Sequence, residues 1–538
     1  MHPRYSQREL DHLLERDHTL YSGVLWGLEG RRVELRARAT SVLPGPCDVM
    51  SCVQITGMAK DIIKESARRI DAAFKKLKIP QSHVKILVDL SPADLPKGGT
   101  WLDLPIAIIS LQAAGILPDL REVSEERFLV IGEIGIHGDV RRVPGVLSLA
   151  GLTTAGQAII LPAGNEREAS LITAAAGHEG TAICPVSSLE QVVDYFKGVH
   201  PLPNALAQKI DYDAVVEKAP DIGRVKGQKE AKDAALIAAA GGHNILLIGP
   251  PGEGKTLLAN AISGILPRLS RREVVEITTI YSACGELKED GMVVHRRPFR
   301  TVHHTVTKPG LVGGGAGVPV PGEITRSHLG VLFLDELPEF SPSTLEALRQ
   351  PLEDGVVRIS RVGASVEYPS RFTLVAAMNP CPCGYYGDER CRCSEKDVKK
   401  YQSRISGPIL DRIDLKVEMQ TLSTEERFAE PAKDLSTEFR ARVEIARRRQ
   451  DKRFEGTTIP FNAAIPGGHI MDYCSFSASA ATRYKELVDS HRITTRSMDR
   501  LARVARTVAD LYNSDSVEPP HLDKAASFVL PGLLKVLF

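Results

Sequence analysis

The chain has 538 residues, of which 43% are hydrophobic and 25% are charged, and its 68 Lys+Arg against 67 Asp+Glu leave a net charge of +1. This composition is typical of a globular protein and excludes a disordered, collagen-like or coiled-coil chain. Because the net charge is close to zero, any contact with nucleic acid must come from local basic patches.

Neither a membrane span nor a signal peptide is predicted. The longest uncharged stretch, residues 143–165, is interrupted by glycines and prolines, which argues against a span. The first 18 residues are polar and charged, where a signal peptide needs an apolar run. We therefore expect a cytoplasmic protein with no membrane partner, in which nine cysteines do not form a disulfide framework.

Residues 1–205 alternate short strands and helices. ELRARAT and VKILVDL have strand character, AKDIIKESARRIDAAFKKLK predicts an amphipathic helix, and a second, apolar helix is predicted over 105–114. Two prolines and the lack of a clear period over 200–208 predict a linker.

The rest of the chain changes from strand–helix alternation to helices. Over 206–435, the runs NILLIG, VLFLDE and TLVAAMN predict buried strands of a parallel sheet. Over 436–538, segments such as RSMDRLARVARTVADLY place apolar residues at helical spacing. The sequence thus predicts an α/β protein with three domains, 1–205, 206–435 and 436–538.

A phosphate-binding loop is predicted between the strand NILLI and the helix that opens with TLLANAISGIL. The segment GPPGEGKT fits the pattern GxxxxGK[ST], whose backbone N–H groups surround phosphates at a helix N-terminus. In this pattern the lysine reaches the β- and γ-phosphates of ATP and the last hydroxyl ligates Mg²⁺. The predicted nucleotide-binding residues are Gly249, Pro250, Pro251, Gly252, Glu253, Gly254, Lys255 and Thr256.

Two other strands end in residues suited to ATP hydrolysis. VLFLDE ends in Asp335, expected to hold Mg²⁺, and Glu336, expected to polarise the attacking water. TLVAAMNP ends in Asn379, which either orients the water, or senses the γ-phosphate, or only forms a turn before Pro380. Arginines in the following YQSRISGPILDRIDLKVEM are either surface residues or an arginine finger for a neighbouring subunit's ATP.

Four of the nine cysteines lie in CPCGYYGDERCRC. Two close pairs of thiolates joined by a short loop can supply the four ligands of a structural Zn²⁺, although C-x-C is tighter than the usual C-x₂-C. Surface thiols are the alternative. The expected ligands are Cys381, Cys383, Cys391 and Cys393, whereas His303 and His304 have no acidic or thiol partner at ligand spacing and receive no role.

The segments VKGQKEAKDAALIAAAGGHNILLIGPPGEGKT, GVLFLDELPEF, AAMNPCPCG and SRISGPILDRIDL resemble those of the magnesium-chelatase-like branch of AAA+ ATPases. The overall layout resembles the ComM/YifB group of this branch, named for a hexameric DNA helicase that drives branch migration in natural transformation. The resemblance implies a hexameric ATPase acting on DNA, with a helical carboxy-terminal lid. It also implies that Arg412, with Arg404 second, is the finger, and that Arg496, ahead of Arg500 and Arg503, is the sensor of the γ-phosphate.

The amino-terminal segments GEIGIHGDVRRVPGV and LSPADLPKGGTWLDLPIAI are similar to the catalytic domain of Lon protease, an α+β fold of the ribosomal-protein S5 type. Lon proteases need a serine and a lysine. Where the serine is expected, this sequence has Thr100, Trp101 and Asp103. Where the lysine is expected, it has Ser148. Because nucleophilic catalysis needs both groups, we expect a scaffold or binding module without protease activity.

Two functions remain open from the sequence, a DNA motor and a chelatase-type motor that remodels a protein partner. A hairpin is predicted over 356–368, around Val362 and Gly363, and the resemblance places it in the pore of a ring. Its arginines either contact DNA phosphates or pair with acids when the hairpin only packs subunits together. The expected DNA contacts are Arg358 and Arg361, with Arg296, Arg297 and Arg300 of a second insertion behind them.

Overall fold

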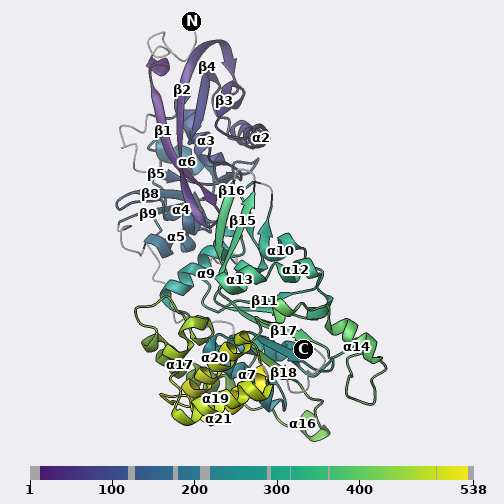
Figure 1. Ribbon diagram of the computed structural model, residues 1–538. Helices are drawn as coiled ribbons and strands as arrows, with labels where there is room; N and C mark the ends of the chain where they lie inside the picture. Colours follow the sequence, from purple (N-terminus) through teal and green to yellow (C-terminus); the bar gives the residue numbers. More distant parts are fainter. Residues whose placement is uncertain are drawn as a thin grey trace.

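The computed structural model describes residues 12–118, 128–173, 178, 180–205, 219–287, 293–315, 317–361, 364–491 and 493–530. The molecule is elongated, with a β-rich amino-terminal body at one end and a group of carboxy-terminal helices at the other (Figure 1). No helix within the described ranges is long and apolar enough to cross a bilayer. Part of the expected linker, 206–208, and the hairpin turn at 362–363 lie outside the described residues.

A seven-stranded sheet, in the order β3-β4-β2-β1-β5-β8-β9, forms the amino-terminal body. Its strands are β1 (Asp17–Trp26), β2 (Glu29–Cys47), β3 (Val53–Thr56), β4 (Ser82–Ser91), β5 (Phe128–Val130), β8 (Ala158–Pro162) and β9 (Ala182–Val186), with a small pair β6 (Glu133–Ile134) and β7 (Val140–Arg141). The helices are α2 (Lys60–Lys76), α3 (Asp103–Ala113), α4 (Val146–Ala150), α5 (Glu166–Thr173) and α6 (Leu189–Phe196). Both predicted helices are confirmed, and α3 is buried along its whole length because almost all its residues are apolar.

Five parallel strands form the central sheet of the middle part, in the order β11-β14-β17-β10-β18. They are β10 (Ile245–Ile248), β11 (Phe299–Val302), β14 (Val331–Leu334), β17 (Thr373–Met378) and β18 (Leu415–Glu418), and helices α7 (Lys229–Gly241), α8 (Lys255–Ile265) and α9 (Arg271–Ala283) pack near them. Every residue of β10, β14 and β17 is buried, which confirms the three predicted strands. Because the strands are parallel, their carboxyl ends lie along one edge of the sheet.

Short elements fill the connections of this middle part. They are α10 (Lys308–Val312), β12 (Gly313–Gly314), β13 (Val320–Pro321), α11 (Glu323–Arg326), α12 (Pro342–Glu346), α13 (Arg349–Asp354), β15 (Val356–Arg361), β16 (Ala364–Pro369), α14 (Glu395–Gln402), α15 (Gly407–Leu410) and α16 (Thr424–Phe428). Strands β15 and β16 pair antiparallel from Val356↔Pro369 to Arg361↔Ala364, as the sequence predicts.

The carboxy-terminal helices are α17 (Leu435–Arg453), α18 (Ile470–Cys474), α19 (Ala478–His491), α20 (Thr495–Leu511) and α21 (Pro519–Val529). Helices α17, α19, α20 and α21 share one apolar core with α7, α8 and the central sheet, whereas α18 packs in a smaller cluster with Ala502 of α20. The buried His243 joins the two parts, because its Nδ1 lies 3.1 Å from Asp414 Oδ2 and its Nε2 lies 2.8 Å from Thr507 Oγ1.

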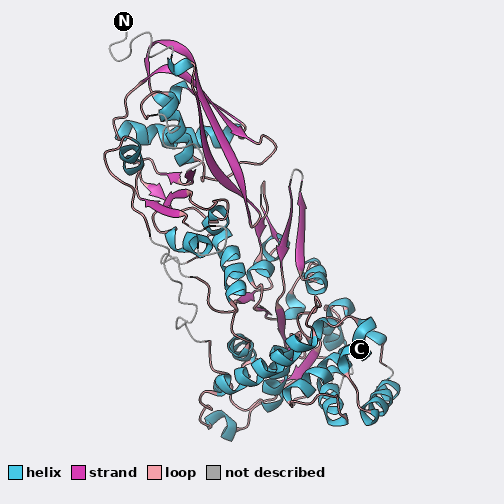
Figure 2. Ribbon diagram, turned by 90° about the vertical axis from the view of Figure 1, so that its left-hand side faces the viewer, coloured by secondary structure: helices cyan, strands magenta, loops and turns pink. Residues whose placement is uncertain are grey.

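The turn between β1 and β2 rests on the β15–β16 hairpin, and Figures 1 and 2 show these long strands reaching toward the middle part. Gly27, in this turn, has a φ of 66°, and a Cβ there would lie 3.3 Å from Val366 and 3.4 Å from Tyr368. Trp26 and Leu28 pack against the apolar cluster of the middle part. The amino-terminal body is thus in direct contact with the hairpin.

Candidate active site

The phosphate-binding loop connects β10 to α8 and has the backbone shape that its glycines permit. Gly252 and Gly254 have φ values of 84° and 88°, a left-handed conformation that residues with a Cβ rarely adopt. The Glu253 side chain turns away from the loop, where it accepts hydrogen bonds from Arg427 Nη2 at 3.1 Å and from the Leu422 N–H at 3.3 Å. Glu253, one of the eight predicted nucleotide-binding residues, therefore anchors the loop to the segment after β18.

The ammonium group of Lys255 occupies the centre of this loop. It donates to the carbonyl oxygens of Gly249 and Pro250, at 2.6 and 2.8 Å, and to Asn379 Oδ1 at 3.0 Å. Burial lowers the pKa of Lys255, and nearby carboxylates only partly oppose that effect. An arriving phosphate would restore a counter-charge to this desolvated cation, which favours binding of an anion.

The predicted magnesium residues converge at the carboxyl ends of β10 and β14. Thr256 Oγ1 lies 3.5 Å from Asp335 Oδ2, and the Glu336 backbone N–H donates to Asp335 Oδ1 at 3.0 Å. Glu336 has a φ of 55°, which is uncommon for a residue other than glycine and occurs often at functional sites. Its side chain is 51% exposed, so it is open to water and to a bound nucleotide.

Sequence reasoning missed a histidine beside Glu336. His304 Nδ1 lies 3.3 Å from Glu336 Oε2, and the rings of His303 and His304 are 3.9 Å apart. Spacing along the chain offered these histidines no acidic partner and no role, whereas the fold brings Glu336 beside His304. Strand β11 pairs with β14 in register Val302↔Leu334, so residues that follow these two strands meet at one edge.

The four cysteines of the predicted metal site gather in the loop after Asn379. Their sulfur atoms lie within 4.8 Å of one another, with Cys381–Cys383, Cys383–Cys391 and Cys381–Cys391 separations of 3.3, 3.7 and 3.9 Å. Hydrogen bonds from the backbone of Arg392 and Tyr385 lower the pKa of Cys383 to about 6, whereas the neighbouring thiols raise the pKa of Cys391 and Cys393, so the metal-free cluster favours one thiolate shared among its sulfurs. Tetrahedral Zn²⁺ with bonds of about 2.3 Å holds its sulfurs about 3.8 Å apart, so the donor set fits zinc.

The cysteine loop contacts the phosphate-binding loop. A Cβ on Gly384 would lie 2.7 Å from Pro251 Cδ and 3.9 Å from Asn379 Cγ. The shape of this loop is therefore coupled to two of the predicted nucleotide-contacting residues.

The predicted finger and sensor lie at the amino-terminal ends of the strands, opposite the phosphate-binding loop. Asn244, which precedes β10, donates to the carbonyl oxygen of Arg412 at 2.8 Å, and Arg496 Nη1 lies 3.4 Å from Asp411 Oδ2. At about 3.3 Å per residue, the length of β10 separates these strand ends from the phosphate loop by more than an arginine side chain can reach. Neither arginine can therefore contact the ATP bound by its own chain in this conformation.

The two arginines line a common cavity of about 610 Å³. Arg412 is only 10% exposed and is paired with Glu353, whereas Arg496 is 69% exposed. Arg500, ranked below Arg496 from the sequence, is buried and donates to the carbonyl oxygen of Ile413 at 2.9 Å. Arg503 also lines the cavity.

Arg404, the second finger candidate, lies on the phosphate-loop side. Its Nη1 lies 2.8 Å from both carboxylate oxygens of Glu339, three residues after Glu336. The two finger candidates therefore lie at opposite ends of the strands of the central sheet.

The five predicted DNA-contacting arginines do not form one surface. Arg358 and Arg361 are exposed on the hairpin, where Arg358 Nε pairs with Glu367 at 2.7 Å. Arg297 instead donates to the carbonyl oxygens of Pro267 and Leu329.

Two further arginines are also engaged inside the middle part. Arg300 forms a bidentate ion pair with Glu323, with N···O distances of 2.7 and 2.9 Å. Arg296 Nη2 donates to Ser263 Oγ at 3.0 Å. Both Arg297 and Arg300 are thus held by internal acceptors, and their contact with DNA stays a prediction.

Three family models match most of the chain. The model described as magnesium chelatase, subunit ChlI, matches residues 221–427, that described as subunit ChlI of Mg-chelatase matches 48–165, and that described as subunit ChlI C-terminal matches 433–528. The central match contains the phosphate loop, the acidic pair, Asn379 and Arg412.

The chain is also similar to full-length proteins. It is 37% identical to YifB of Escherichia coli over 506 residues, covering 93% of this chain and 95% of the relative. It is 34% identical to the competence protein ComM of Haemophilus influenzae over 523 residues, covering 95% and 96%. The magnesium-chelatase 67 kDa subunit of Heliobacterium mobile is 26% identical over 57% of this chain and 47% of its own.

Proposed function

Because the chain belongs to the ComM/YifB family of magnesium-chelatase-like AAA+ proteins, which bind and hydrolyse ATP with Mg²⁺, we propose that it forms a ring, most simply a hexamer, that moves along DNA. In this proposal it acts as a helicase or branch-migration translocase. One observation carries the ring: the phosphate loop and Arg412 lie at opposite edges of the same sheet. Head-to-tail contact would bring Arg412 and Arg496 of one subunit to the ATP of the next.

The β15–β16 hairpin supports DNA as the substrate. It carries two exposed arginines and continues into β17, whose end leads directly to Asn379. A change at the γ-phosphate can therefore move the hairpin through a single strand. The runner-up is a motor that remodels a protein partner, as the similarity to magnesium-chelatase subunits suggests.

ATPase assays separate the two functions. The DNA proposal expects forked or three-stranded DNA to stimulate hydrolysis and expects strand displacement that depends on ATP. Duplex DNA serves as the comparison substrate. No stimulation by any DNA, with a well-formed ring and normal basal ATPase, would instead favour a protein substrate.

Replacing both Arg358 and Arg361 by alanine is expected to weaken DNA binding while basal ATPase and ring assembly persist. The ion pair of Arg358 is exposed, and such pairs contribute about 0–1 kcal/mol, so phosphate can displace Glu367. On single-stranded DNA the salt slope of log K should fall by about 0.7 per lost contact. Fluorescence anisotropy over a salt series measures this slope.

Arg349→Ala is the matched control, because this exposed arginine pairs with Glu346 on the neighbouring helical segment. Its DNA affinity should equal that of the wild type. If the double variant binds DNA normally but no longer assembles, the hairpin is a subunit contact rather than a DNA contact.

We propose that the cysteine loop binds one structural Zn²⁺ through Cys381, Cys383, Cys391 and Cys393. Metal analysis of the purified protein should find one zinc per chain. Changing Cys391 and Cys393 to serine should abolish the zinc and lower the melting temperature, whereas Cys284→Ser, outside the cluster, should retain the metal. Fewer than half a zinc per chain with fully reduced thiols would contradict the assignment.

We propose that the amino-terminal body is a Lon-like scaffold or binding module without protease activity. Ser148, at the position of the Lon lysine, donates its hydroxyl to the Leu28 carbonyl oxygen at 2.6 Å. Asp103 is buried and pairs with Arg69 at 2.9 Å. Both side chains thus serve the packing of this body, whose β1–β2 turn contacts the proposed DNA-binding hairpin.

A further inference from the structure

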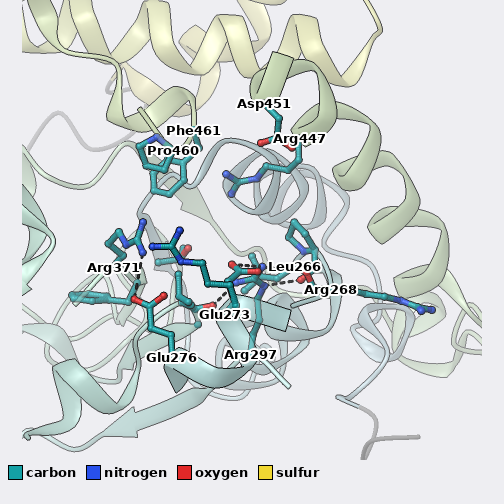
Figure 3. A pocket seen from close by; sticks show the side chains of 16 residues that line it. Leu266, Arg268, Glu273, Glu276, Arg297, Arg371, Arg447, Asp451, Pro460 and Phe461 are labelled. Carbon is teal, nitrogen blue, oxygen red and sulfur yellow. Dashed lines mark hydrogen bonds and ion pairs between the residues drawn. The ribbon is translucent and has the colours of Figure 1, made fainter. Parts of the chain in front are cut away.

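A second cavity, of about 490 Å³, lies on the side of the central sheet opposite the phosphate loop. Helix α9, the loop before it and residues at the start of β11, β14 and β17 form one wall, and helix α17 with the loop at 460–461 forms the other. In Figure 3, Arg447 and Phe461 face Arg297 and Glu273 across this space. The cavity is thus built from both the middle part and the carboxy-terminal helices.

Basic side chains dominate the lining. Five arginines and three acidic residues contribute, which leaves an excess of two positive charges: Arg268, Arg272, Arg297, Arg371 and Arg447 against Glu273, Glu276 and Asp451. The two glutamates are already engaged, Glu273 with Arg297 at 3.1 Å and Glu276 with Arg371 at 3.5 Å. The third acid, Asp451, lies one turn from Arg447 on helix α17 and attracts it electrostatically, but among the described residues no hydrogen bond or ion pair joins the two.

Arg447 lines the cavity from helix α17. Its Nη2 donates to the Ala239 carbonyl oxygen at 3.0 Å, and its guanidinium stacks on Phe461 at 4.9 Å. Its Nε atom is inaccessible to solvent and has no hydrogen-bond partner within the described ranges. Burial lowers the pKa of Arg447 to about 10, so the group stays charged at neutral pH. A desolvated charge whose hydrogen bonds are incomplete is costly, and a bound anion would lower that cost.

We propose that this cavity binds a phosphate-bearing small molecule of mononucleotide size, with its phosphate against Arg447 and Arg371 and its ring against Phe461. Guanidinium groups are the preferred partners of phosphate. The volume lies within the range of about 300–1,000 Å³ typical of small-molecule sites. The cavity is separate from the ATP site, because the two lie at opposite edges of the sheet.

The proposed ligand site shares residues with the cavity that contains the proposed trans-acting arginines. Arg371, Phe372, Pro460 and Phe461 line both this cavity and the neighbouring one that contains Arg412 and Arg496. A ligand that fixes Arg371 and Phe461 therefore also reshapes the surroundings of the proposed trans-acting arginines. This effect on the trans-acting arginines depends on the proposed function. Binding of the ligand to the cavity does not depend on it.

Calorimetric titration of the full-length protein tests the binding. The phosphate loop is first saturated with a non-hydrolysable ATP analogue and Mg²⁺, and inorganic phosphate, GMP and guanosine are then titrated separately. GMP should bind more tightly than inorganic phosphate, and guanosine should not bind. Arg447→Gln should weaken GMP binding by about tenfold or more, as expected for the loss of a charged hydrogen bond.

Arg448→Gln is the matched control, because Arg448 is the exposed neighbour of Arg447 on the same helix, and its GMP affinity should be unchanged. Arg371→Gln, at an exposed position, provides a second test if Arg447→Gln does not fold. Absence of phosphate-dependent binding, or equal binding by wild type and both variants, would overturn the proposal. GMP binding no tighter than inorganic phosphate would overturn the contact with the ring. An ATPase rate that does not respond to bound GMP would contradict only the link to the trans-acting arginines.

Discussion

Replacing Glu336 by glutamine is expected to leave ATP binding nearly intact and to slow hydrolysis by about 10²–10⁴-fold, the usual contribution of a positioned general base. The amide keeps the shape of the carboxylate but cannot accept a proton from water. Lys255, Thr256 and Asp335, which bind the phosphates and Mg²⁺ in the proposed site, do not depend on this side chain. The structure places Glu336 next to Asp335 and open to solvent.

Two measurements check this result. Binding of a fluorescent ATP analogue should be close to that of the wild type, while phosphate release falls to near background. Size-exclusion chromatography with ATP should show a ring that no longer dissociates. Glu339→Gln is the control, because this exposed acid lies in the same segment but pairs with Arg404. Wild-type turnover by the Glu336 variant would show that another group activates the water.

The strands, the phosphate loop and the hairpin could be predicted from the sequence because their signals are local. A buried strand followed by GPPGEGKT specifies its neighbours within about ten residues along the chain. The register Val302↔Leu334 is not local. The pair His304–Glu336 joins two strands through that register, and spacing along one segment could not reveal it. Polar residues after adjacent parallel strands were the available signal.

Basic runs were the weakest guide to function. The segment HRRPFR has the composition of an exposed phosphate-binding patch, since charged runs are usually solvated. The structure instead uses Arg297 to bind carbonyl oxygens and Arg300 to pair with Glu323. In the run at 447–449, Arg447 faces a cavity, Arg448 is exposed, and Arg449 pairs with Asp515. Only the fold decides which arginine of such a run meets solvent.

Replacing Arg412 by alanine should abolish ATP turnover, by about 10³–10⁵-fold for a finger that stabilises the transferring phosphoryl group. ATP binding should survive, because Arg412 lies a strand length away from its own phosphate loop. Its partner Glu353 is 56% exposed, so the loss leaves no buried unpaired acid and the fold should persist. Circular dichroism and nucleotide binding verify both points. Arg404→Ala, at the other edge, should lose far less activity.

Mixing two inactive variants tests whether Arg412 acts on the neighbouring subunit. Lys255→Ala removes the phosphate contact but keeps the arginine, whereas Arg412→Ala does the reverse. In an equimolar mixed ring with head-to-tail contacts, about a quarter of the interfaces join an intact phosphate loop to an intact arginine. ATPase activity should therefore reappear on mixing and reach its maximum near equal proportions. If the mixture stays as inactive as its components while mixed rings are shown to form, Arg412 does not act across the interface. A role within its own chain would then require a different conformation of the segment from Ser406 to Asp414.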